Sequence, residues 1–131
     1  AAYDAADDPA RYPHAGEAWR PARLFYGVMA RSFFVRMREA LEQAGAERMP
    51  FGNADLDRMG YDDNAVSLAL DVSDQVAAKI AGFLAHQTQF GPESPSSQMP
   101  EDMRQAMLAH EHLVQARPAL PPGVQLNDLW G

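Results

Sequence analysis

Two apolar segments, each followed at once by a helical pattern, constrain the fold of this chain most. The first, RLFYGVM at residues 23–29, is short, aromatic and apolar on both faces, which is typical of a strand buried on both sides in a sheet. The second, AVSLALDV at residues 65–72, alternates between large apolar residues and small or polar ones. A repeated strand–helix order is typical of the α/β class. Because two strands alone do not make a stable sheet, we expect other segments or a partner to complete it.

Helices are predicted near residues 32–44, 73–89 and 100–117. Ser32 is a candidate N-cap of the first, and Gly45 stands where a C′ residue belongs. The apolar face of the third predicted helix consists of Met103, Met107, His110 and Val114. Residues 118–131 are predicted to form an extended tail. Residues 45–64 show no clear period, which fits a lid, an arm that packs on another subunit, or a surface excursion with a few anchors.

Length and composition exclude several classes of protein. The 131 residues suffice for one domain with a core, and the absence of cysteine excludes disulfides and thiol nucleophiles. The net charge is −7 without a basic block, so we expect no nucleic-acid partner. Without a run of 18 apolar residues or a signal peptide, we expect no membrane span and a cytoplasmic location. The chain opens without Met on AAYDAADD, which resembles the end of a helix, so we expect a longer natural protein.

The chain contains no complete catalytic signature. Its histidines lack the i,i+4 spacing of the zinc-protease helix, and no nucleophile elbow or phosphate loop is present. Within the third predicted helix, His110 and His112 point to opposite sides, one packed and one in solvent. His86, Thr88 and Gln89 end the second predicted helix at the edge of a core, where they bond neighbouring backbone carbonyls or contact a ligand. We therefore assign no catalytic residue and no metal ligand within this chain.

Four segments that cover nearly the whole chain carry a resemblance to a known family. They are AAYDAADDPARYPHAGEAWRPARLFY, RSFF, GYDDNAVSLALDVSDQVAAKIAGFLAHQTQF and LVQARPALPPGVQLNDLWG. The most specific parts are the DP, YP and WRPARLFY residues of the first segment and the DVS and LAHQTQ residues of the third. In this order they resemble the C-terminal part of the LmbE-like, or PIG-L, N-deacetylases.

The resemblance implies a zinc-dependent amide hydrolase that removes acetyl groups from N-acetylglucosamine-type conjugates. It implies a Rossmann-like three-layer α/β sandwich, of which residues 1–131 would be the C-terminal segment. The zinc ligands of the family lie upstream of the position that corresponds to Ala1, so this segment alone is expected to be inactive. The implied partners are the N-terminal, metal-binding half of the same protein and an N-acetylated sugar conjugate, and a second copy of the chain is a further candidate.

The resemblance also marks candidate residues for the wall of the substrate pocket or for the layer behind it. Arg23 starts the first strand, where it would hold a carbonyl oxygen, orient a catalytic group or pair with a nearby acid. Asp63 lies in the acidic turn before the second strand. Thr88 and Gln89 match a persistent part of the family pattern, whereas His86 is absent from some members. The alternative interpretation is a non-catalytic assembly or binding module, or a family member that has lost its metal.

Overall fold

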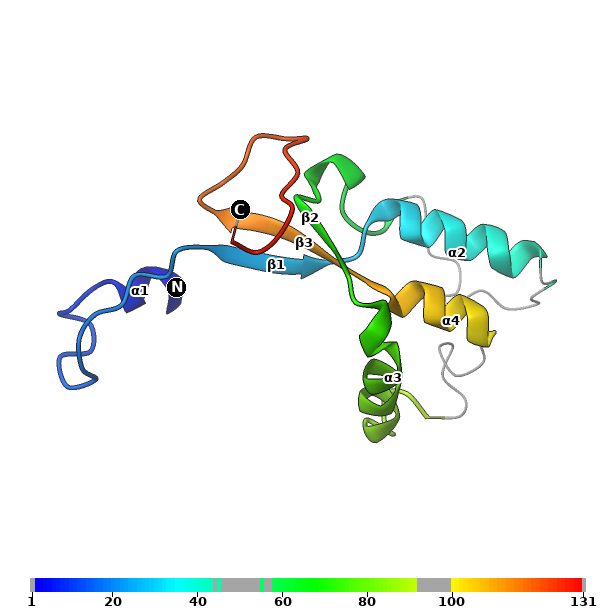
Figure 1. Cartoon of the computed structure of the whole chain (residues 1–131), viewed down its shortest axis with the longest axis horizontal. Helices are drawn as coiled ribbons and strands as arrows, with labels where there is room; N and C mark the ends of the chain where they lie inside the picture. Colours follow the sequence, from blue (N-terminus) through cyan, green and yellow to red (C-terminus); the bar gives the residue numbers. More distant parts are fainter. Residues whose placement is uncertain (1, 44, 46–54, 56–57, 92–99, 131) are drawn as a thin grey trace.

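The computed structural model describes residues 2–43, 45, 55, 58–91 and 100–130 of the chain (Figure 1). Helices and strands follow one another along the chain, with 3₁₀ turns at Asp63–Ala65 and Ser73–Gln75. In chain order they are α1 (Ala2–Ala6), β1 (Leu24–Val28), α2 (Arg31–Gln43), β2 (Leu68–Asp71), α3 (Val76–Ala85), α4 (Glu101–Leu108) and β3 (His110–Arg117).

The strands form a three-stranded sheet in the order β1-β3-β2, and both neighbours of the central β3 are antiparallel to it. In the register, Val28 of β1 and Ala69 of β2 both lie opposite His112. The prediction of an α/β chain is confirmed at this level, while the Rossmann-like sandwich stays a prediction. The helices α2, α3 and α4 gather near one end of the sheet, and α1 lies beyond the other end (Figure 1).

The prediction of a helix over residues 100–117 is wrong in its second half. The helix α4 ends at Leu108, and the chain continues as β3. The methionine spacing that suggests one long helix ends with α4. In the strand that follows, successive side chains alternate between the two faces of the sheet, with Leu113 and Gln115 on one face and His112 and Val114 on the other. Because β3 pairs on both edges, its backbone N–H and C=O groups find partners in two strands distant in sequence, which favours strand over helix.

The first predicted strand and helix are confirmed. β1 lies within the predicted residues 23–29, and α2 matches the predicted 32–44 to within one residue at each end. Gly45 has a φ of +68°, the left-handed conformation typical of a C′ residue. The expected burial of both faces of the strand is wrong for the described residues, since Tyr26 is 53% exposed. β1 is an edge strand of an antiparallel sheet, which can leave one face open.

The second predicted pair is confirmed with shorter bounds. β2 occupies only the last part of the predicted residues 65–72, because a 3₁₀ turn occupies Asp63–Ala65. The predicted helix 73–89 begins with a 3₁₀ turn, continues as α3 and ends at Ala85. His86 has φ −91° and ψ 60°, which no longer continues a helix. The polar run that follows is therefore a turn.

A hydrophobic core cluster lies under α2. Phe34, Met37 and Leu41 are buried on one face of this helix, at the i, i+3, i+7 spacing of an amphipathic helix. Met103 and Met107 of α4 pack against them. This contact joins α4 to α2 beside the sheet. Most of the predicted lid or arm at 45–64 lies outside the described residues.

The C-terminal residues run back along the chain that leads into β2. The backbone N–H of Gly123 donates to the carbonyl of Asn64 at 3.0 Å, and that of Leu126 donates to the carbonyl of Ser67 at 2.7 Å. At the other terminus, the Tyr3 hydroxyl donates to the Pro21 carbonyl at 3.0 Å, which ties α1 to the segment before β1. In the part of the chain that the structure describes, no helix is both long and apolar enough to cross a membrane.

Candidate functional site

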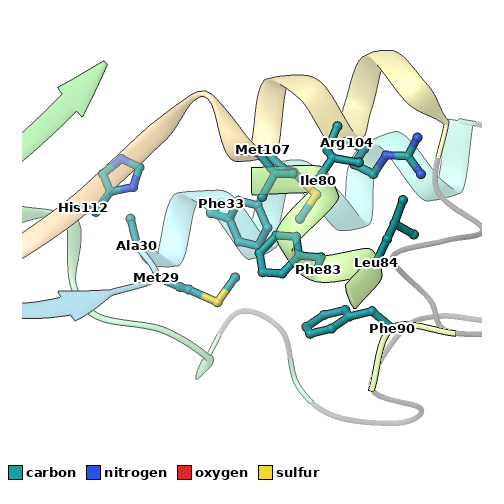
Figure 2. Close-up of a pocket in the computed structure, with 11 residues that line it drawn as sticks. Met29, Ala30, Phe33, Ile80, Phe83, Leu84, Phe90, Arg104, Met107 and His112 are labelled. Atoms are coloured by element: carbon teal, nitrogen blue, oxygen red, sulfur yellow. The ribbon is translucent and has the colours of Figure 1, made fainter. Parts of the chain in front are cut away.

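An apolar cavity of about 320 Å³ opens where α2 begins and where α3 and α4 meet (Figure 2). Phe33 comes from α2, Ile80 and Phe83 from α3, and Met107 from α4. Phe90, which follows α3, stacks on Phe83 with ring centroids 4.8 Å apart and closes one side. Because these walls offer few hydrogen-bond partners, the cavity suits an apolar group.

A second cavity of about 390 Å³ lies between α2 and α4 and reaches the start of β3. It shares part of its wall with the first cavity, namely Phe33, Met107 and His112. Its polar lining differs, because Arg36 and His110 stand beside the shared His112, whereas Arg104 lines the first cavity. The two cavities thus place an apolar and a basic environment side by side at one end of the sheet.

His110 and His112 lie on the same face of β3, with ring centroids 6.4 Å apart. The expectation that they point to opposite sides is wrong, because side chains two residues apart share a face in a strand. The pKa of His112 is lowered, first by burial and then by the positive charges of His110 and Arg36. Asp63 and Glu111 act in the opposite direction. His112 is therefore neutral at pH 7, with one ring nitrogen able to donate and the other able to accept.

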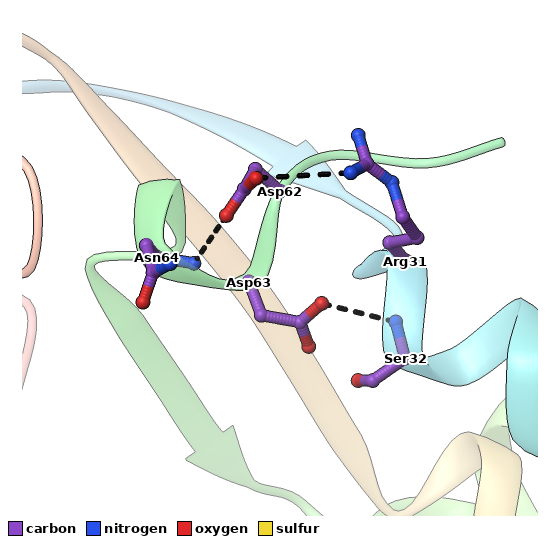
Figure 3. Close-up of polar contacts among 5 residues, drawn as sticks. All are labelled: Arg31, Ser32, Asp62, Asp63 and Asn64. Carbon is purple, nitrogen blue, oxygen red and sulfur yellow. Dashed lines mark hydrogen bonds and ion pairs between the residues drawn. The ribbon is translucent and has the colours of Figure 1, made fainter. Parts of the chain in front are cut away.

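Asp63 holds the start of α2 (Figure 3). Its Oδ2 accepts the backbone N–H of Ser32 at 3.0 Å. The helix begins one residue earlier than Ser32, so the prediction of Ser32 as N-cap is wrong, and a carboxylate from a distant turn satisfies this N–H instead. The adjacent Asp62 accepts from the backbone N–H of Asn64 and lies 3.7 Å from Arg31 Nη1. Asp63 does not line either cavity.

Replacing Asp63 by alanine is expected to lower the free energy of unfolding by about 1 kcal/mol at pH 7, the usual cost of a lost helix cap. The hydrogen bond from the Ser32 side chain is the largest cause that lowers the pKa of Asp63, and the bond from the Ser32 backbone N–H lowers it further. Together they outweigh burial, which raises this pKa, and the positive charge of Arg36 lowers it a little more. A lowered folded-state pKa means that this stability is present above the unfolded pKa of 3.8 and is lost as pH falls through the folded value.

Urea unfolding at pH 7 and at pH 3 measures this effect. Asp63→Asn is the matched control, because the amide keeps an acceptor oxygen but does not titrate in this range. We expect the Asn variant to keep more stability than the Ala variant at pH 7 and to show a weaker loss on acidification than the parent. Equal stability of parent and Ala variant at pH 7 would contradict the capping role.

The structure places Arg23 away from both cavities. Its Nη1 donates to the backbone carbonyl of Leu129 at 3.3 Å. In the ladder, Leu24 lies opposite Arg117, whereas the cavities lie near His112 at the opposite end of β1. Among the described residues, the partner of Arg23 is thus a carbonyl of the C-terminal segment and not an acid. A pocket role of Arg23 stays a prediction.

His86, Thr88 and Gln89 form an exposed turn after α3. The carbonyl of His86 accepts the backbone N–H groups of Gln89 and Phe90, each at 2.9 Å. This turn directs Phe90 back onto Phe83 and into the wall of the apolar cavity. The five candidate residues are therefore not brought together, and their pocket roles stay predictions.

Sequence reasoning missed Arg36 and the shared face of His110 and His112. The segment HEHLVQAR does not alternate cleanly between apolar and polar residues, so the sequence carries no strong local signal for a strand that places the two histidines on one face. Arg36 carries no local signal, because only the packing of α4 beside α2 turns this position toward a cavity.

The described residues do not fit a zinc site by themselves. Among them, no group of three or more His, Asp or Glu side chains could hold a metal ion. Catalytic zinc requires about three protein ligands and one open position.

Comparison with known proteins finds relatives of one kind. The chain is 31% identical over 126 residues to the 1D-myo-inositol 2-acetamido-2-deoxy-alpha-D-glucopyranoside deacetylase 2 of Frankia casuarinae, covering 93% of this chain and 40% of the relative. Deacetylases with the same substrate name match from Geodermatophilus obscurus (32% identity, 85% of this chain, 38% of the relative) and from Thermobispora bispora (38% identity, 72% of this chain, 30% of the relative).

The chain is thus homologous to deacetylases over most of its own length, and it spans about 40% of the length of the first of these relatives. No family model matches the chain. No solved structure matches it at a significant level.

Proposed function

We propose that this chain is part of a zinc-dependent N-deacetylase of the LmbE-like, PIG-L type, a hydrolase that cleaves the acetamide of an N-acetylglucosamine-type conjugate. The observation that carries the proposal is the similarity to the deacetylase of Frankia casuarinae, which extends over 93% of this chain. The two further relatives described above carry the same activity in their names. An N-acetylglucosaminyl-inositol is therefore the first substrate to test.

The rest of the active site is proposed to come from outside these residues. The chain spans only 30–43% of the relatives it matches, and the described residues supply no set of metal ligands. We propose that a region corresponding to the remainder of the relatives binds the zinc and completes the sheet, whose outer strands β1 and β2 each pair on one edge within the described residues. When bound in such an enzyme, zinc polarises the amide carbonyl and activates water.

The contribution of this chain would be a rigid frame and part of the pocket wall. Asp63 fixes the start of α2. Lys79 of α3 donates to the carbonyl of Leu108 at 2.7 Å and pairs with Glu111 at 2.7 Å, which fixes α3 to the junction of α4 and β3. The ammonium group of Lys79 lies at the C-terminal end of α4, where a positive charge also interacts favourably with the dipole of that helix. The exposed His86, Thr88 and Gln89 are available to bond sugar hydroxyls.

The test is deacetylation by the full-length natural protein. We expect free amine and acetate to form from N-acetylglucosaminyl-inositol, activity to disappear after treatment with a chelator, and zinc to restore it. Inactivity of the full-length protein together with an absence of bound zinc would overturn the proposal. That outcome would leave an assembly module or a metal-free relative as the remaining interpretation.

Pocket residues are tested in the same assay. Because Thr88 and Gln89 are exposed, the variant Gln89→Ala should fold like the parent. A raised KM with unchanged kcat would indicate that the turn binds the sugar. Unchanged KM and kcat would contradict a sugar-binding role of this turn.

A further inference from the structure

The cavity between α2 and α4 combines an apolar floor with a basic rim. The floor includes Met37 of α2 and Met103 of α4. The rim consists of Arg36 of α2 and the two histidines of β3, His110 and His112. At about 390 Å³ the cavity has the size of a small-molecule site. Methionine side chains adapt to differently shaped apolar groups.

All polar side chains that line this cavity are basic, although the chain carries a net charge of −7. Within the described residues, no carboxylate contributes to its wall. Burial lowers the pKa of His112 most, and the positive charges of His110 and Arg36 lower it further. An anion placed among these groups would relieve that repulsion.

The acids that interact electrostatically with the two histidines are engaged elsewhere. Asp63 accepts a backbone N–H at the start of α2. Glu111 alternates with the two histidines, so it points to the other face of the sheet, where it pairs with Lys79 at 2.7 Å. Asp71 lies opposite His110 in the ladder, but its Oδ1 accepts the backbone N–H of Ser73 at 2.9 Å. These acids attenuate the positive field without occupying the cavity.

We propose that this cavity binds a small organic anion, a carboxylate or phosphate monoester with an apolar body. The acid group would lie against Arg36, His110 and His112, where a guanidinium offers paired N–H donors to two oxygens. The apolar body would lie over Met37 and Met103. This site is independent of the deacetylase proposal, since neither its residues nor its test involve amide cleavage.

The experiment titrates the full-length protein with hexanoate and follows the ring signals of His110 and His112 by NMR. We expect both sets of signals to shift with one dissociation constant at pH 6.5. Affinity should be higher at pH 5.5 than at pH 8, because a bound anion favours the protonated form of His112, whose pKa is lowered. Hexyl phosphate in place of hexanoate shows which acid group the rim prefers.

Arg36→Gln removes the charge from an exposed position and should weaken hexanoate binding about tenfold, as expected for one charge-assisted hydrogen bond. The matched control is Arg38→Gln on the same helix, because Arg38 pairs with Glu42 and does not line the cavity. Hexan-1-ol has the apolar body without the acid group, and acetate has the acid group without the long apolar body. Both should bind more weakly than hexanoate.

The proposal is overturned if hexanoate leaves the His112 signals of the full-length protein unchanged at millimolar concentration. Equal binding of hexanoate and hexan-1-ol would overturn it as well. So would Arg36→Gln and Arg38→Gln variants that bind hexanoate like the parent.

Discussion

Replacing Gly60 by alanine is expected to lower the free energy of unfolding by about 2–4 kcal/mol. Gly60 has a φ of +79°, a conformation that residues with a Cβ rarely adopt. An added Cβ would lie 2.7 Å from the carbonyl oxygen of Met29 and 2.9 Å from Cε2 of Phe34. Neither neighbour can move easily, since one is backbone and the other is a core side chain that is 3% exposed. Strain and steric overlap therefore add.

The turn at Gly60 joins the segment before β2 to the start of α2. The backbone N–H of Tyr61 donates to the Met29 carbonyl at 2.9 Å, and the N–H of Arg31 donates to the Tyr61 carbonyl at 2.8 Å. A shifted turn would weaken both bonds and disturb the position of Asp63, three residues further on. We therefore expect loss of stability to be accompanied by fraying of the first turn of α2.

Urea unfolding at pH 7 measures the change, and amide hydrogen exchange at the start of α2 reports the fraying. Gly27→Ala is the matched control, because Gly27 has no positive φ and an added Cβ there would meet nothing within 4 Å. We expect this control to change stability by less than about 1 kcal/mol. Similar losses in the two variants would contradict the tight approach at Gly60.

Sequence patterns were sufficient for β1 and α2 because several local signals agree there. The apolar run is short enough for a strand, the helix has a clear buried face at Phe34, Met37 and Leu41, and Gly45 supplies the left-handed residue at its end. The predicted length of α3 is too great, because polar residues such as His86 and Gln89 fit a helix end as well as a turn. The carbonyl of His86 resolves this choice by accepting two N–H groups of a turn.

The strand β3 could not be assigned from its helical spacing. Met103 and Met107 belong to a real helix, and His110 and Val114 continue the same spacing by coincidence. Pairing with β1 and β2 decides between helix and strand for these residues. The residues of β2 lie more than 30 positions earlier in the chain, and those of β1 lie more than 80 positions earlier. Such pairing is tertiary information that local propensity does not contain.

The candidate site shows the same limit. Polar residues were recognisable as candidates one by one, but Arg23 and Asp63 contact the backbone of different segments, at Leu129 and Ser32 respectively. The basic rim at Arg36 arises only because α4 packs beside α2 and β3 begins at their junction. A site built from three elements is predictable from sequence only when a recognised motif marks it, and the described residues contain none.

Replacing Leu68 by alanine is expected to cost about 2–5 kcal/mol, the usual range for a fully buried leucine. Leu68 is 1% exposed and lies opposite Leu113 of β3 in the sheet. Its burial depends on the strand at His110–Arg117, because a helical continuation of α4 would remove the residue opposite it. The substitution therefore tests the corrected assignment as well as the core.

The matched control is Leu84→Ala, which removes the same atoms from a side chain that is 55% exposed and should cost less than about 1 kcal/mol. Urea unfolding of the full-length protein measures both variants, with unchanged m values showing that the comparison concerns stability alone. If Leu68→Ala proves no more costly than Leu84→Ala, the pairing of β2 with β3 is wrong. A large difference supports the pairing of β2 with β3, which places the apolar Leu113 opposite Leu68.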